Sequence, residues 1–448
     1  MLPRCRRRIP FITGTLFLFT TVLIFMMIQD FHSFPASRHD MNPSDRNLYK
    51  DSRVDAGTAF AAMREDPLED GRYEADDVKE KEALSPSDEK KNHMIVNYDV
   101  HIFYYPWYGN PEVDGDWYHW NHQYLPHWEK KSNLDGQRHQ PPDDIGANFY
   151  PQLGPYSSAD EITIRMHMKQ IQSAGIGVVV VSWYPPHMAD QEGKEPDSLM
   201  SKLLIAAEEQ NLKVALQIEP FKCRSATTMR DALTYAFHTY GSHPAFYKTR
   251  RGTRDLPVIY IYDSYLVTDE EWKRLLLPSG NLTVRSTDLD AIFLGLLVEA
   301  RHIQSIHQSG FDGAYTYFAA KDFSFGSTWA LWVQTSRSFH AKKLLFVPSV
   351  GPGYIDTRIR PWNGVTTRLR NDGGYYNSSW RYALGARPDF VSITSFNEWH
   401  EGSQIEPAIP KEIDSFRYID YTPQKPDYYL QLTRTWISSW NQKRKSRD

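Results

Sequence analysis

The chain has 448 residues, 41% of them hydrophobic and 14% aromatic, so it can bury a large core, and one large barrel domain with appendages fits this length. The formal net charge is -4, so the whole chain lacks the positive electrostatic footprint of a nucleic-acid-binding protein. We therefore expect no nucleic acid partner.

The N-terminus carries a basic cluster, Arg4 and Arg6 to Arg8, followed by an uncharged run from Ile9 to Gln29. About 20 apolar residues in a helix span the hydrocarbon core of a bilayer. Because positive charge stays on the cytoplasmic side, we predict a cytoplasmic tail at residues 1–8 and a transmembrane signal anchor at residues 9–29. A cleaved signal peptide is the alternative, but the run is long for one and offers no small-residue cleavage site.

Residues 30–97 are charged and poor in valine, isoleucine and leucine, so they cannot bury enough apolar surface to offset the entropy of ordering. This composition predicts a disordered lumenal stem. Cys5 precedes the anchor, which leaves Cys223 without an intrachain disulfide partner in the lumen. Asn281 and Asn377 begin N-x-S/T sequons and are glycosylation candidates in a chain of the secretory pathway.

From residue 98 onward, short β-branched and aromatic runs alternate with amphipathic stretches. Runs such as Val178 to Val181 are continuously apolar, as in parallel strands buried on both faces. Eight such runs predict a (β/α)8 TIM barrel over residues 98–442, followed by a basic C-terminal tail at residues 443–448. The predicted strands are Val100–Tyr105, Gly177–Trp183, Val214–Glu219, Val258–Tyr262, Ala291–Val298, Gly313–Tyr317, Leu344–Pro348 and Phe390–Ser395.

The helices expected between the strands have apolar residues at spacings of three and four. Asp197 and Ser225 are the expected N-caps of two of them, and a final helix is expected at about residues 426–440. A doubly wound sheet is disfavoured, because no glycine-rich phosphate loop follows the first strand.

The residues that follow the predicted strands are polar or aromatic, as expected of an active site at the carboxyl end of a barrel. Aromatic rings stack on sugar rings and polar groups bond sugar hydroxyls, so this mixture indicates a carbohydrate ligand. These strand-end segments are Pro106–Asn110, Tyr184–Pro186, Glu219–Pro220, Tyr262–Tyr265, Tyr315–Tyr317, Gly351–Tyr354 and Asn397–Gly402.

Glu398 and Glu401 follow the eighth predicted strand. Glycosidic cleavage needs one carboxylic acid to protonate the departing oxygen and a second carboxylate as nucleophile or base. Two like charges in one partly dry cleft also raise one pKa, which an acid working near neutrality requires. An arbitrary pair at this spacing is more often a solvated surface pair, but the position after a barrel strand favours a catalytic pair.

Two metal interpretations are weaker. The histidines of the segment Trp117 to His127 have H-x-x-H spacing but neither a third ligand at a helical offset nor a cysteine. The triplets Asp114–Asp116 and Asp288–Asp290 suggest a metal-dependent Golgi glycosyltransferase, which would share the anchor and stem. Such triplets are frequent by chance, and the nucleotide-binding βαβ opening of a transferase is missing.

Six motifs in the predicted barrel are long and specific: Phe103–Pro111, Pro141–Gly146, Ser182–Pro186, Pro348–Asp356, Arg360–Asn363 and Ile393–Gly402. Together they resemble the glycoprotein endo-α-1,2-mannosidases, glycoside hydrolase family 99. The resemblance covers the chain from about residue 98 to its end. It implies a Golgi type II membrane enzyme that cleaves the α-1,2-mannosidic bond of glucosylated high-mannose N-glycans with retention and releases glucosyl-α-1,3-mannose.

The resemblance also implies residue roles. Glu398 is expected to deprotonate the 2-hydroxyl of the mannose being cleaved, which then forms a 1,2-anhydro sugar, and Glu401 is expected to be the general acid. The expected substrate-contacting residues are Tyr105, Tyr184, Tyr317, Arg360 and Asn397. No metal or cofactor is implied.

Two departures from the family pattern, Gln217 in place of a histidine and the divergent segment 321–332, are expected to affect specificity rather than catalysis. A lumenal glycan-binding protein with weak or lost turnover is the other alternative, which the intact glutamate pair disfavours.

Overall fold

The computed structural model describes residues 96–445 of the chain. The predicted cytoplasmic tail, the signal anchor and nearly all of the predicted stem lie outside these residues. Within the described part of the chain, no helix is long and apolar enough to cross a membrane.

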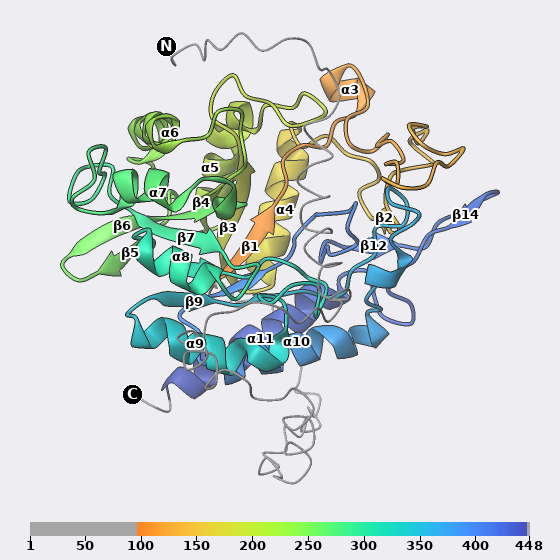
Figure 1. The fold of residues 1–448 in the computed structure, drawn as a ribbon. Coiled ribbons are helices and arrows are strands. Elements are labelled where there is room, and N and C mark those ends of the chain that lie inside the picture. Colours follow the sequence, from red (N-terminus) through yellow and green to blue (C-terminus); the bar gives the residue numbers. More distant parts are fainter. Residues whose placement is uncertain (1–95, 446–448) are drawn as a thin grey trace, which may run out of the picture. The chain divides into compact units, whose positions relative to one another are not determined.

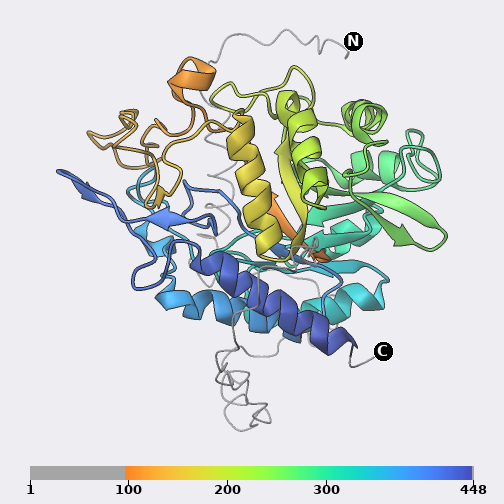
Figure 2. The ribbon, with the colours of Figure 1, turned by 180° about the vertical axis from the view of Figure 1, so that it is seen from behind.

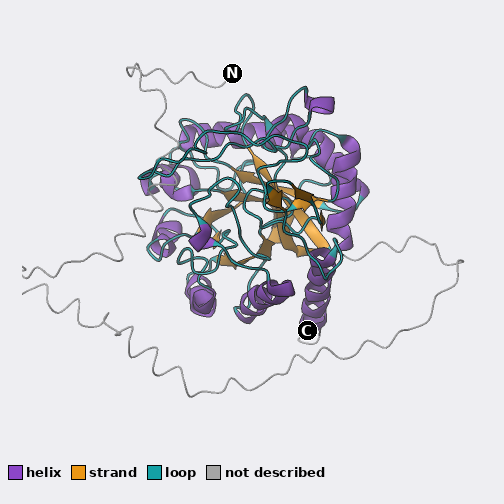
Figure 3. Cartoon of the chain, turned by 90° about the vertical axis from the view of Figure 1, so that its right-hand side faces the viewer, coloured by secondary structure: helices purple, strands orange, loops and turns teal. Residues whose placement is uncertain are grey.

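The described residues form a parallel β-barrel surrounded by helices, which confirms the predicted (β/α)8 fold (Figure 1). In Figure 3, which looks from the right-hand side of Figure 1, the strands lie in the centre and the helices lie around them. The strands that correspond to the eight predicted ones are β1 (Asn97–Tyr104), β3 (Ile176–Trp183), β4 (Lys213–Ile218), β6 (Arg254–Ile261), β7 (Ile292–Leu296), β8 (Gly313–Tyr315), β9 (Leu345–Val347) and β11 (Val391–Ile393).

The seventh predicted strand differs from the expectation, because it consists of two pieces. β9 pairs with β8, whereas β10 (Ser349–Val350) pairs with β11 on the other side. Pro348 lies between the pieces and has no N–H to donate to a ladder, so the pairing changes partner there. β11 also pairs with β1. The interrupted strand therefore links β8 to β11 and nearly closes the barrel.

The helices cover the outer surface of the barrel. They are α4 (Glu161–Ser173), α5 (Met200–Glu209), α6 (Ala226–Tyr240), α7 (Asp269–Leu276), α8 (His302–Gln308), α9 (Trp332–Ala341), α10 (Gly374–Gly385) and α11 (Tyr428–Lys445). In Figure 2, α11 crosses the outside of the barrel and reaches α4, which it contacts. The final helix therefore lies where the last and first βα units meet.

The prediction of Ser225 as an N-cap is confirmed, since it forms a capping box with Thr228 at the start of α6. The prediction for Asp197 is wrong. Asp197 lies inside a 3-10 turn, Pro196–Leu199, and its carboxylate accepts hydrogen bonds from the Trp183 indole at 2.8 Å and the Tyr235 and Tyr240 hydroxyls at 2.8 Å each. Three side-chain donors from neighbouring elements thus replace the backbone N–H groups that a cap would bind.

Three short antiparallel strand pairings accompany the barrel or lie outside it. The hairpin of β5 (Lys248–Arg251) with β6 was not predicted, because β5 is charged and half exposed. A second pairing joins β2 (Tyr150–Pro151) to β12 (Ala408–Ile409), and a third joins β13 (Glu412–Ile413) to β14 (Phe416–Arg417). A short helix, α3 (Pro111–Asp114), follows β1, and Gly109 forms a backbone bridge with Tyr118 nearby.

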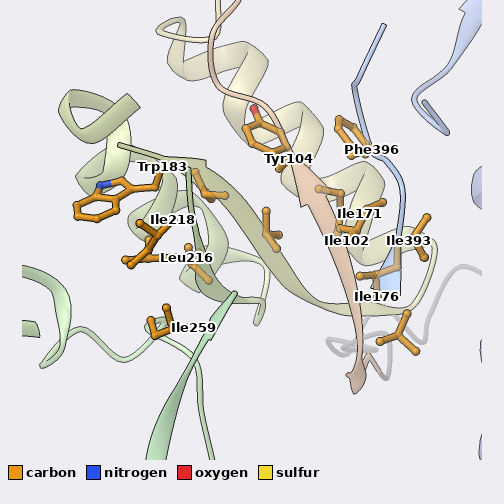
Figure 4. Packing of buried hydrophobic residues seen from close by; sticks show 14 of the residues in the cluster. Ile102, Tyr104, Ile171, Ile176, Trp183, Leu216, Ile218, Ile259, Ile393 and Phe396 are labelled. Carbon is orange, nitrogen blue, oxygen red and sulfur yellow. The ribbon is translucent and has the colours of Figure 1, made fainter. Parts of the chain in front are cut away.

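Alternate residues of each strand belong to two apolar clusters, as the pleat of a strand requires. Val179 and Val181 pack with helix residues such as Ile171 in the outer cluster, part of which Figure 4 shows. Val178 and Val180 pack with Phe103 and other strand residues in the inner cluster. The continuous apolar run in β3 therefore serves two cores at once, one inside the barrel and one beneath the helices.

Candidate active site

The two glutamates lie on the loop that follows β11, at the carboxyl end of the barrel, as predicted. The backbone N–H of Glu398 donates to Ser395 Oγ at 2.8 Å, and its Oε1 accepts from the His400 N–H at 3.1 Å. The Glu401 carbonyl accepts from the N–H of Ile355 at 2.8 Å. The loop is thus fixed from within and from the segment after β10.

Both carboxyl groups have perturbed pKa values. Burial, with the neighbouring Glu401 charge, raises the pKa of Glu398 well above its usual range, and the side chain is only 4% exposed. Burial also raises the pKa of Glu401 to about 7, although the Arg360 guanidinium opposes this rise. The site therefore retains a carboxyl proton near neutral pH, which an acid–base pair needs.

Arg360 is the cation that faces this pair, and it lowers the pKa of both glutamates. Its Nη1 lies 3.0 Å from Asp356 Oδ2, and Asp356 is fully buried. Asp356 also accepts from Asn363 Nδ2 at 2.9 and 3.1 Å and from the Tyr354 hydroxyl at 3.0 Å. Asp356 thereby fixes the direction in which the guanidinium points.

Asn397 joins the glutamate loop to the end of β1. Its Oδ1 accepts from the Tyr105 N–H at 2.8 Å, and its Nδ2 donates to the Tyr105 carbonyl at 2.9 Å. The Tyr108 hydroxyl donates to the Asn397 carbonyl at 3.0 Å and accepts from the Trp399 N–H at 3.1 Å. Asn397 is fully buried, so these contacts position the loop, while its contact with substrate stays a prediction.

Tyr105 follows β1 and Tyr317 follows β8, which are not neighbouring strands, and the two hydroxyl groups share a short hydrogen bond. Tyr317 has a φ of 52°, in the left-handed region, so the backbone leaves the strand direction after Tyr315 and β8 ends earlier than predicted. The Tyr262 ring stands edge-on to Tyr317 at 5.0 Å. Glu398 and Glu401 both act electrostatically on Tyr105 and Tyr317, which places the two tyrosines beside the pair.

Sequence reasoning noted Glu219 at a strand end but did not select it as a site residue. Its Oε1 accepts from Gln217 Nε2 at 2.7 Å and Ser182 Oγ at 2.8 Å, and burial raises its pKa to about 7. Tyr184, a predicted substrate contact, is half-buried. Its burial and the Glu219 charge raise the pKa of its hydroxyl. Gln217 therefore contacts a third carboxyl group of the barrel mouth.

Arg224, from the loop before α6, adds a half-buried charge to this region. It donates to the Tyr262 carbonyl at 2.7 Å and the Asp263 carbonyl at 2.5 Å. Asp263 has a φ of 46° and accepts from the Tyr265 hydroxyl at 2.7 Å. The only signal for this cluster in the sequence was its position after the third and fourth predicted strands.

The divergent segment 321–332 begins close to Tyr317. Phe318 packs against both Tyr317 and Phe323, and Trp329 packs against Tyr375 of α10. The segment therefore contacts the barrel mouth at its first residues and the outer helices at its last ones. Its effect on specificity stays a prediction.

The histidines and aspartates considered as metal ligands have other partners. His119 Nε2 lies 3.0 Å from Asp190 Oδ2, and His127 stacks on Trp128. Asp114 pairs with Lys194 at 2.6 Å, and Asp290 pairs with Arg254 and Arg285. Between residues 96 and 445, no group of three or more His, Cys, Asp or Glu side chains could bind a metal ion.

The two sequons lie in different environments. Asn281 is exposed on the loop after α7, where its Oδ1 accepts from Arg274 Nε at 3.1 Å. Asn377 lies half-buried in α10, where its Oδ1 accepts from the Trp436 indole of α11 at 2.8 Å. Glycosylation of both stays a prediction, and Asn281 is the more accessible residue.

Comparison with known families places this geometry in context. A family model described as Glycosyl hydrolase family 99 matches residues 95–442. A glycoprotein endo-alpha-1,2-mannosidase of Xenopus laevis is 51% identical over 347 residues, which is 77% of each chain. A glycoprotein endo-alpha-1,2-mannosidase-like protein of Homo sapiens is 50% identical over 346 residues, or 77% of this chain and 76% of its own.

Solved structures agree with these sequence matches. The GH99 endo-alpha-mannosidase from Bacteroides thetaiotaomicron is 43% identical, with a TM-score of 0.72 over 78% of this chain and 98% of that one. A glycoside hydrolase-like protein that is 14% identical, with a TM-score of 0.51, shares the fold alone.

Proposed function

The chain belongs to glycosyl hydrolase family 99 and is therefore a glycoside hydrolase, and we propose that it cleaves the α-1,2-mannosidic bond of glucosylated high-mannose N-glycans, releasing glucosyl-α-1,3-mannose. The observation that carries this proposal is the pair of buried Glu398 and half-buried Glu401, whose pKa values are raised and on which the charge of Arg360 acts. The relatives named as endo-alpha-1,2-mannosidases supply the linkage.

The proposed reaction retains the anomeric configuration through two displacements at C1. Glu398 removes the proton of the mannose 2-hydroxyl, and the resulting O2 attacks C1 while the bond from C1 to the leaving oxygen breaks. Glu401 gives its proton to that leaving oxygen. Water then attacks C1 of the 1,2-anhydro sugar, Glu401 takes the water proton, and Glu398 returns its proton to O2.

The proton must lie on Glu401 and not on Glu398 when the bond breaks. Burial raises the pKa of Glu398 well above its usual range, which favours a proton there. A substrate 2-hydroxyl that donates to Glu398 stabilises its carboxylate and so lowers that pKa. Substrate binding is thus part of how the two carboxyl groups acquire their roles.

Arg360 supports this arrangement by its charge. A guanidinium near both glutamates allows one of them to stay ionised in a buried cleft. Tyr105, Tyr184 and Tyr317 supply aromatic and hydroxyl groups around the pair, as a sugar-binding cleft requires. No step in this scheme needs a metal ion.

The test is digestion of a glucosylated high-mannose N-glycan, with products read by mass spectrometry. Wild type is expected to release a hexose disaccharide, Glu401→Gln to release none while still binding glycan, and the exposed Glu412→Gln to match wild type. Glycan binding without product from wild type would show the alternative, a binding protein. Turnover that requires manganese and a sugar nucleotide would show the transferase, whereas full turnover in chelator would exclude it.

We further propose that the enzyme is a single-pass type II protein of the Golgi membrane with its catalytic domain in the lumen. The supporting feature is the basic cluster before the apolar run at residues 9–29. Protease treatment of intact Golgi vesicles is expected to spare the barrel until detergent is added. Digestion without detergent would place the barrel on the cytoplasmic side and refute this topology.

A further inference from the structure

Arg370 lies on the loop between β10 and α10 and contacts the main chain just beyond Glu401. Its Nη2 donates to the Gly402 carbonyl at 2.9 Å and to the Gln404 carbonyl at 2.7 Å. A planar guanidinium can bond two carbonyls from one fixed position, which a lysine ammonium on a flexible stem cannot do equally well. The arginine therefore fixes the direction of the chain that carries Glu401.

Three aromatic rings in turn fix Arg370. Its guanidinium carbon lies 4.5 Å from the Phe149 ring, 4.9 Å from the Tyr421 ring and 4.5 Å from the Tyr429 ring. Cations within about 6 Å of a ring face are attracted by its quadrupole, more strongly when water is excluded. Nε and Nη1 are buried without hydrogen-bond partners, so this aromatic cage is what surrounds them.

The loop at Gly402 borders a cavity and also packs closely on Ile355. A cavity of about 240 Å³ borders Gly402, Arg370 and Tyr354. Gly402 has a φ of 58°, and a Cβ there would lie 2.6 Å from Ile355 Cγ2, so this position requires glycine. The hydrogen bonds from Arg370 and from the Ile355 N–H therefore add to this close contact in fixing the chain that carries Glu401.

We propose that Arg370 is a positioning residue for the general acid Glu401, acting through the Gly402 and Gln404 carbonyls. This inference rests on the acid role proposed above for Glu401. A displacement of about 1 Å in a reacting group can cost about 100-fold in rate. Loss of the arginine should therefore reduce acid catalysis without removing the residues that bind the sugar.

The test compares two substrates with the same glucosyl-mannose part. One is the natural glycan, whose leaving sugar needs a proton, and the other is the corresponding α-glycosyl fluoride, whose leaving group needs little acid assistance. Enzyme in excess gives the rate of the first bond cleavage, before hydrolysis of the intermediate. For Arg370→Met we expect that rate on the glycan to fall about 30-fold, and that on the fluoride to change less than about threefold.

Arg368 provides a matched control, because it lies two residues away and donates to the carbonyls of Lys321 and residues 365–367 instead of the acid loop. Arg368→Met is expected to affect both substrates equally. Arg370→Lys keeps the charge in the cage but loses the planar fork, so it should show the same selective loss, about tenfold, and it serves if Arg370→Met does not fold.

Equal losses on both substrates in the Arg370 variants, or a higher KM with unchanged kcat, would overturn the proposal and leave a purely structural role. Glu401→Gln separates this outcome from failure of the proposed function. If that variant loses glycan cleavage but retains fluoride release, the acid assignment stands whatever the Arg370 variants do. If wild type cleaves neither substrate, the proposed function itself fails.

Discussion

Two kinds of buried glutamate occur within nine residues of one loop. Glu406 is fully buried, with Oε1 3.1 Å from His167 Nε2 and Oε2 accepting from the Tyr156 hydroxyl at 2.8 Å and the Trp399 indole at 2.9 Å. Glu398, by contrast, accepts from backbone N–H groups and faces a like charge on Glu401.

This difference in hydrogen-bond donors and neighbouring charge distinguishes a structural carboxylate, Glu406, from a reactive one, Glu398. Side-chain donors satisfy both oxygens of Glu406, so its burial is compensated and it ties α4 to the active-site loop through His167. The desolvation of Glu398 and of the half-buried Glu401 is compensated less well, and it raises the pKa of both carboxyl groups. Under-compensated burial thus identifies the catalytic pair better than burial itself.

The largest expected effect comes from changing a member of the reactive pair. Glu401→Gln should lower kcat on the natural glycan by about 1,000-fold or more, because general acid catalysis contributes about 100- to 10,000-fold. Glu398→Gln should cause a loss of similar size. Initial rates of disaccharide release measure both, with Glu412→Gln as the exposed control; losses below about tenfold would contradict the assignment of the pair.

The structural glutamate should show the opposite pattern. Glu406→Gln leaves an amide N–H₂ facing donors that an oxygen accepted, so we expect a loss of about 3 kcal/mol in the free energy of unfolding. Denaturant unfolding at constant pH measures it. A variant as stable as wild type would show that the three hydrogen bonds to Glu406 contribute little.

The pH dependence of stability should also distinguish the two kinds of residue. Because the folded-state pKa of Glu401 is about 7, above its unfolded value, its favourable contribution is fully present below about pH 4.5 and is lost as the pH rises through 7. Relative to wild type, the free energy of unfolding of Glu401→Gln should therefore rise by about 2 kcal/mol between pH 5 and pH 8. Unfolding curves at both pH values test this, and a constant difference would contradict the raised pKa.

A structural feature of this molecule can be predicted from the sequence when its cause lies in neighbouring residues. The eight strands follow from apolar runs, and the capping box of Ser225 follows from local chemistry. The change of partner at Pro348 was not foreseen, because it depends on which strands lie on either side. The β5–β6 hairpin was missed because its first strand is charged, although Gly252 marks the turn with a φ of 61°.

The site divides in the same way. Glu398 and Glu401 could be found because they follow a predicted strand and share one short loop. Asp356, Glu406 and Arg370 could not, because their importance comes from partners far away in the chain, such as His167, 239 residues from Glu406. The sequence gives the residue types at a barrel mouth, while the folded chain decides which buried carboxylates are compensated.

Glu219 offers the test with the smallest expected effect, because it shares features with both kinds of glutamate, the structural Glu406 and the reactive pair. It accepts two side-chain hydrogen bonds, from Gln217 and Ser182, yet burial still raises its pKa to about 7. Gln217→Leu removes one donor at similar volume, so the pKa of Glu219 should rise further, by about one unit, equivalent to about 1.4 kcal/mol. Carboxyl ¹³C chemical shifts followed through a pH titration measure it. An unchanged pKa would mean that desolvation alone sets the protonation of this carboxyl group and that counting donors does not rank buried glutamates.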